Sequence, residues 1–89
     1  MELTQVLARM RELMALPGND FGWSSWNDAA EALAEFDALA AEVGAGGRPA
    51  GMRLLFLPTG PLQELSISSG WGNDYLYLAA RFDEAFQAE

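Results

Sequence analysis

The side chains in this chain that could do chemistry are carboxylates, hydroxyls and arginines, because the 89 residues include no histidine and no cysteine. The commonest general base and the commonest metal ligand are therefore both missing. Ser-His-Asp and Cys-His catalytic arrangements cannot be assembled, and Ser66, Ser68 and Ser69 have no base near them in the sequence. We expect a protein that is not an enzyme and that needs no cofactor.

A metal site is also not expected. A cysteine-rich zinc site is excluded by composition. The acidic and polar stretch "NDFGWSSWND", residues 19–28, lacks the alternating ligands and the final glutamate of a calcium-binding loop.

The carboxylates occur in a short motif that the sequence contains twice. Residues 27–37 and 73–83 both read Asn-Asp, then seven residues, then Phe-Asp. Helix capping followed by a buried aromatic residue explains the motif; the alternative is a duplication that brings two equivalent helix starts to one place. The final aspartates fall at the border of an apolar helix face, where aspartate usually pairs with arginine, and Arg53 or Arg81 could serve.

The three tryptophans, Trp23, Trp26 and Trp71, all precede one of the later helices. A tryptophan at a helix entry often closes one end of a core. Alternatively, the two loops lie side by side and form a partly exposed aromatic patch for recognition. The polar rim of that patch would then consist of Asn19, Asp20, Asn27, Asn73 and Asp74.

The net charge of −8 excludes some partners and favours others. Because a chain with this much negative charge repels phosphate backbones, we expect no binding to nucleic acid. Asp28, Glu31, Glu35 and Glu42 share one narrow stripe of a helix, with no lysine or arginine three or four residues away. The stripe is either a solvated face or a surface that docks onto a basic partner.

Hydrophobic periodicity and turn residues predict one α+β domain of 89 residues with the order α-α-β-β-α. Its expected parts are a helix at 2–16, an aromatic loop at 17–26, a helix at 27–43 with Ser25 as its N-cap, a glycine-rich connection at 44–51, a β-hairpin at 52–68, a loop at 69–73 and a helix at 74–87. The hairpin rests on two short segments. "MRLLFL" suits a buried strand, and "LQELSIS" places Leu65 and Ile67 on one face after the turn "PTGP".

These features favour a non-enzymatic, cytoplasmic protein-interaction module, of which an inhibitor or immunity-type protein that neutralises a basic target is a special case. The partner surface would combine the tryptophan loops with the acidic stripe. The alternative is a small-ligand-binding domain or accessory enzyme subunit with a pocket lined by Trp23, Trp71 and Tyr75. The chain contains no apolar run of the roughly 20 residues that cross a bilayer, so no membrane contact is expected.

A symmetric homodimer is a further expectation. A two-stranded hairpin leaves two unpaired edges, and an alanine face at residues 30, 34, 38 and 41 is smooth enough for another helix to approach. The competing view is a monomer in which the first helix covers the alanine face and the third helix covers the sheet.

Overall fold

A computed structural model describes residues 1–22 and 24–87 of the chain. Within these residues the chain forms five α-helices and no strand. The helices are α1 (Leu3–Met14), α2 (Ala29–Gly44), α3 (Ala50–Leu55), α4 (Pro61–Ser69) and α5 (Gly72–Gln87).

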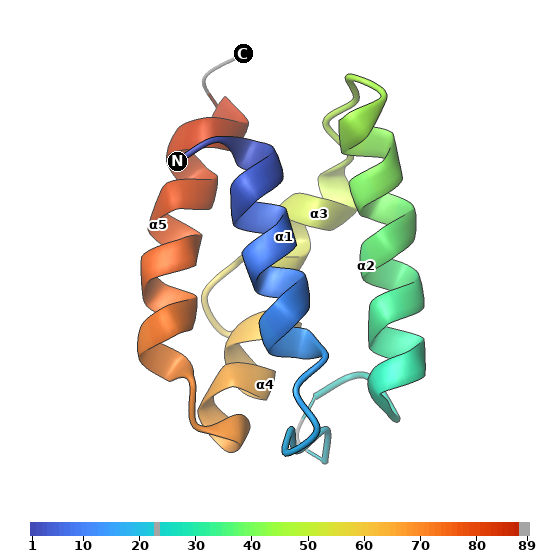
Figure 1. The fold of residues 1–89 in the computed structure, drawn as a ribbon, viewed down its shortest axis with the longest axis vertical. Coiled ribbons are helices and arrows are strands. Elements are labelled where there is room, and N and C mark those ends of the chain that lie inside the picture. Colours follow the sequence, from blue (N-terminus) through green and yellow to red (C-terminus); the bar gives the residue numbers. More distant parts are fainter. Residues whose placement is uncertain (23, 88–89) are drawn as a thin grey trace.

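Helix α1 lies between α5 and α2 and runs antiparallel to both (Figure 1). The short helices α3 and α4 complete the bundle, with α3 against α2 and α4 against α5. Helix α2 is therefore an outer helix, which contacts mainly α1 and α3. In the described part of the chain, no helix combines the length and the apolar character needed to span a membrane.

The predicted α+β fold with a β-hairpin at 52–68 is wrong, because both segments of the hairpin are helical. The buried residues of the first segment are Met52, Leu55 and Phe56, which follow the spacing of one helix face. "MRLLFL" was too short and too apolar for periodicity to separate a buried strand from a buried helical turn.

The second segment shows the same error more clearly. Leu62, Leu65 and Ser66 are fully buried, whereas Ile67 is 68% exposed. A strand would have placed Leu65 and Ile67 on one face, but on a helix they point in different directions. Pro61 occupies the first turn of α4, where a missing backbone N–H has no cost.

The turn signals between the two segments are real, but the turns connect helices. A Cβ atom on Gly60 would lie 2.8 Å from the Leu57 carbonyl oxygen, so the chain requires glycine there. Gly70 ends α4 in the left-handed conformation with φ of 87°, and this is a common helix C-terminus.

The three predicted helices overlap with α1, α2 and α5, and the main difference concerns the start of α2. Its N-cap is Asp28 rather than the predicted Ser25, and the Asp28 carboxylate accepts a hydrogen bond from the Glu31 amide at 2.9 Å. Helix α5 begins at Gly72, one or two residues before the predicted Asn73 or Asp74.

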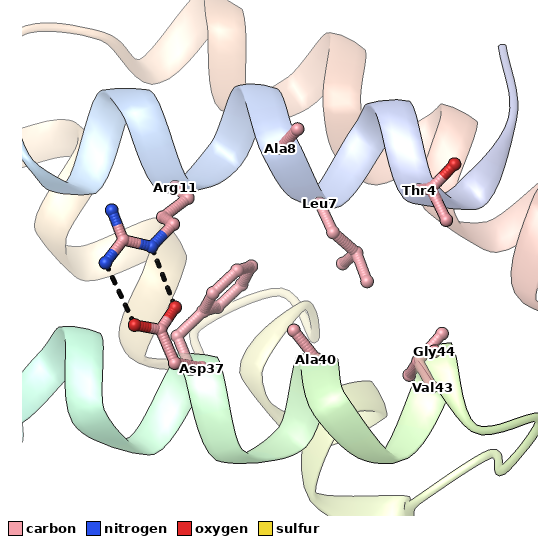
Figure 2. A pocket seen from close by; sticks show the side chains of 9 residues that line it. Thr4, Leu7, Ala8, Arg11, Asp37, Ala40, Val43 and Gly44 are labelled. Carbon is pink, nitrogen blue, oxygen red and sulfur yellow. Dashed lines mark hydrogen bonds and ion pairs between the residues drawn. The ribbon is translucent and has the colours of Figure 1, made fainter.

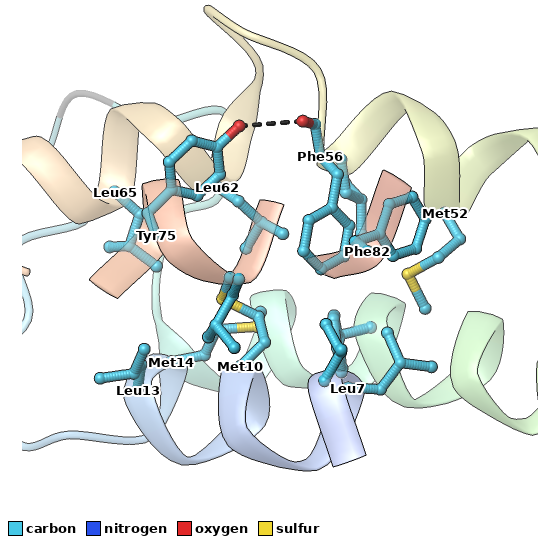
Figure 3. Packing of buried hydrophobic residues seen from close by; sticks show 14 of the residues in the cluster. Leu7, Met10, Leu13, Met14, Met52, Phe56, Leu62, Leu65, Tyr75 and Phe82 are labelled. Carbon is cyan, nitrogen blue, oxygen red and sulfur yellow. Dashed lines mark hydrogen bonds between the residues drawn. The ribbon is translucent and has the colours of Figure 1, made fainter. Parts of the chain in front are cut away.

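All five helices contribute to one apolar core (Figure 3). Phe82 of α5 lies at its centre, with its ring stacked 4.0 Å from Phe56 and 4.7 Å from Phe86. The buried Tyr75 hydroxyl donates a hydrogen bond to the Phe56 carbonyl oxygen at 2.9 Å and approaches that of Leu57 at 3.2 Å. This contact ties α5 to the end of α3.

Candidate functional site

The loop before α2 and the end of α4 are in direct contact through hydrogen bonds. The Asp20 amide donates to the Ser69 hydroxyl at 2.9 Å, and the Ser68 hydroxyl donates to the Asp20 carbonyl oxygen at 2.8 Å. The Trp71 indole N–H donates to Asn19 Oδ1 at 2.9 Å. The two loops are therefore side by side, joined by polar contacts.

The aromatic side chains of this junction are enclosed. Trp71 is only 5% exposed and Tyr75 only 2%. A partner or ligand cannot stack on either ring while the loops keep this arrangement. Their position fits the alternative in which a tryptophan closes one end of the core. The pocket expected between the loops would need both rings at its surface.

Asn19 was expected only as a polar rim residue, and its structural role was missed. Its side-chain amide donates to the carbonyl oxygens of Leu13 and Met14 at 2.8 and 3.0 Å, and its Oδ1 accepts from Trp71. One residue thus satisfies the last turn of α1 and orients the indole. Only its place shortly after Pro17-Gly18, beyond the helix end, could have suggested this role.

Trp26 does not form an exposed aromatic patch with Trp71. Trp26 is 3% exposed, and its indole N–H faces Glu35 Oε1 at 3.4 Å. Trp23 lies outside the described residues. Asn73 and Asp74 are exposed in the first turn of α5, where a carboxylate interacts favourably with the helix dipole.

The acidic stripe on α2 is exposed, and part of it also organises the helix start. Asp28 is the N-cap, Glu31 accepts a hydrogen bond from the Asn27 side chain at 3.0 Å, and Glu35 faces the Trp26 indole. Glu42 is exposed near the other end of the helix. At 3.6 residues per turn, the three glutamates fall within roughly 40° around the helix axis.

The outward surface of α2 combines this stripe with the alanine face. Residues 30, 34, 38 and 41 are all exposed, so neither α1 nor any other helix in the described part of the chain covers them. One of the two reasons for a homodimer, the unpaired strand edges, disappears with the hairpin. The exposed alanine face is the other reason, and the dimer stays a prediction.

On the opposite edge of α2, Asp37 forms a bidentate ion pair with Arg11 of α1 (Figure 2). The two nitrogen–oxygen distances are 2.8 and 2.9 Å. Hydrogen bonding from the Arg11 guanidinium lowers the pKa of the Asp37 carboxyl, and hydrogen bonding to the Asp37 carboxylate raises the pKa of Arg11. An arginine partner was expected for Asp37, but it is neither Arg53 nor Arg81.

A groove of about 220 Å³ lies between α1 and α2, next to this ion pair (Figure 2). Its lining is mostly apolar and consists of Thr4, Leu7, Ala8, Arg11, Phe36, Asp37, Ala40, Val43 and Gly44. No local sequence pattern indicates the groove, because it depends on how closely two helices that are distant in the sequence approach each other. The short side chains on both helices leave the space open.

The described residues contain no group of three or more carboxylates placed to hold a metal ion. The motif repeat does not bring its two halves together: Asp37 pairs across to α1, whereas Asp83 is exposed on α5. The best-defined surface is therefore α2 with the adjoining groove. Comparisons of the chain with protein-family models, with curated proteins and with solved structures gave no match.

Proposed function

We propose that this chain is a non-enzymatic protein-interaction module and that the outward surface of α2 contacts a basic partner. One observation carries the proposal: α2 presents Glu31, Glu35 and Glu42 on an exposed stripe, and the helix has no basic residue of its own. Like charges on one helix face are mutually unfavourable. A cationic partner surface would relieve that repulsion and be guided to the site by the charge.

The position of α2 supports this role. It is an outer helix, and its inward side is held by the core through Phe36 and Val43, which are 1% and 7% exposed. A partner could therefore bind the outward side without disturbing the bundle. Trp26 and Trp71 are both enclosed and are not part of the proposed contact.

The test compares two variants that each lose three negative charges. The first, called the stripe variant, carries Glu31→Gln, Glu35→Gln and Glu42→Gln. It removes the charges of the stripe but keeps side-chain oxygens that accept hydrogen bonds. The second variant carries Glu12→Gln, Glu64→Gln and Glu84→Gln, which make the same change at exposed positions on other helices. Each protein is immobilised and exposed to an extract of its source cells at low and high salt, and captured proteins are identified by mass spectrometry.

We expect the wild type and the second variant to capture the same proteins, and the stripe variant to lose them. Raising the salt should release them, because exposed charges are screened within a Debye length of about 8 Å at physiological ionic strength. Equal capture by the stripe variant, or capture that salt does not weaken, would contradict the proposal.

A further inference from the structure

We infer that the groove between α1 and α2 binds one large apolar side chain of the same basic partner. The backbone of the partner crosses the outer face of α2, so that its cationic residues reach the acidic stripe. The inference rests on the proposed function and adds the anchor that would give the contact its specificity. Charge attracts many basic proteins, whereas a buried anchor in a pocket selects among them.

The size of the groove decides what class of occupant fits. Pockets for cofactors and drug-sized ligands are typically about 300–1,000 Å³, so a volume of about 220 Å³ is small for them. It suits a single leucine, methionine or aromatic side chain. The buried residues of its lining, Leu7, Phe36 and Val43, are all apolar. The short side chains of Ala8 and Ala40 also line it.

The charge around α2 decides what kind of chain carries that side chain. Beside the groove, Arg11 and Asp37 neutralise each other, so an apolar residue can enter without meeting an unpaired charge. Beyond the groove the helix surface is acidic. A second copy of the chain also has a net charge of −8, so electrostatic repulsion opposes its binding to this acidic surface. The matching occupant is a basic segment of another protein.

The alanine face provides the path between the two contacts. Around the helix axis the groove and the acidic stripe are on roughly opposite sides, and Ala34, Ala38 and Ala41 lie exposed between them. Short side chains let a crossing backbone approach closely. An α-helix is about 10–12 Å across and rises 1.5 Å per residue, so a partner helix needs its apolar and cationic residues about seven residues apart.

The experiment uses two synthetic helical peptides as probes. The first carries one leucine about seven residues from a cluster of lysines, and the second has serine in place of the leucine. Dissociation constants are measured for the wild type, for Ala8→Trp, which fills the groove from α1, and for Ala80→Trp. Ala80 is the matched control, since it is also an exposed helical alanine but lies on α5.

We expect the wild type and Ala80→Trp to bind the leucine peptide about tenfold more tightly than the serine peptide, as burying a leucine predicts. Ala8→Trp should bind both peptides equally. The stripe variant should bind both more weakly while keeping the preference for leucine. No preference in the wild type, or a preference that survives in Ala8→Trp, would overturn the inference.

The outcomes also separate this inference from the proposed function. Equal, salt-sensitive binding of both peptides would refute the groove alone, whereas binding that the stripe variant leaves unchanged would contradict the acidic surface. If Ala8→Trp does not fold, NMR of the wild type decides. The methyl signals of Leu7 and Val43 should shift with the leucine peptide and not with the serine peptide; equal shifts, or none, would overturn the inference.

Discussion

Helices α5 and α2 are both 16 residues long, yet they use their side chains in opposite ways. The residues that α5 buries are all large: Tyr75, Leu78, Phe82 and Phe86. Helix α2 buries Ala32, Phe36 and Val43, and it exposes its acidic stripe and the alanine face at residues 30, 34, 38 and 41. One helix contributes mainly to the core, and the other contributes mainly surface. Stability and binding should therefore respond to mutations in different helices.

The largest loss of stability is expected for Phe82→Ala. The ring is fully buried and stacks on two other phenylalanines, so its removal leaves a cavity at the centre of the core. We expect a loss of about 4–5 kcal/mol, which could unfold a domain whose total stability is about 5–15 kcal/mol. Urea denaturation followed by circular dichroism measures the loss, and a value below about 2 kcal/mol would show that α5 is not the centre of the core.

Phe36→Ala is the corresponding change in α2, and we expect a smaller loss of about 3 kcal/mol. Phe36 is equally enclosed, but it lines the groove, so the outer helix can relax towards α1 after truncation. The same denaturation experiment compares the two variants. A greater loss for Phe36→Ala than for Phe82→Ala would reverse the proposed division between the helices.

Tyr75→Phe removes the hydrogen bonds that join α5 to the end of α3 and leaves the Phe56 carbonyl oxygen without that donor. We expect a loss of about 1–2 kcal/mol. Tyr77→Phe is the control, because Tyr77 is 56% exposed on the same helix, and it should change stability little.

The effect of Tyr75 also depends on pH in a defined direction. Burial, together with the nearby Asp83 charge, raises the pKa of Tyr75 above the ordinary tyrosine value of about 10. The contribution of Tyr75 to the free energy of unfolding is therefore fully present below that value, and it is lost as the pH rises through the raised pKa. The difference between wild type and Tyr75→Phe should shrink above about pH 10; a difference that grows there would contradict the assignment.

The smallest effect is expected for Asp37→Asn, because the ion pair with Arg11 is about half exposed. The pKa of Asp37 is lowered in the folded chain. The contribution of Asp37 to the free energy of unfolding is therefore present above the unfolded pKa of about 3.9, and it is lost as the pH falls through the lowered pKa. Thermal denaturation at pH 6 and in acid, chosen around these values, should show a difference only at pH 6. Asp83→Asn, at the equivalent position of the motif repeat, is the control.

The sequence predicted the helices with long amphipathic patterns, because many apolar positions at helical spacing define a face. It failed for residues 52–68, since segments as short as the six residues of "MRLLFL" and the seven of "LQELSIS" fit either a strand or about two helical turns. Leu65 and Ile67 illustrate the failure: their spacing of two is a strand signal, but only Leu65 is buried.

The candidate site was predictable only in part. The acidic stripe follows from the spacing of its residues along one helix. The Arg11–Asp37 pair joins residues 26 positions apart, and the groove depends on the packing of the same two helices, so neither has a local signal. The tryptophans were predicted as binding candidates because of their residue type, but residue type does not show whether a side chain in a loop faces the core or the solvent.

The central claim is that partners bind through α2 and the groove that it forms with α1, and that α4 and α5 do not take part. NMR amide shifts of the wild type, recorded while the leucine–lysine peptide is added, test it most directly. The account predicts that the shifts concentrate on Glu31, Glu35, Glu42 and the residues lining the groove, while α4 and α5 stay unchanged. Shifts concentrated on α4 and α5 would contradict it.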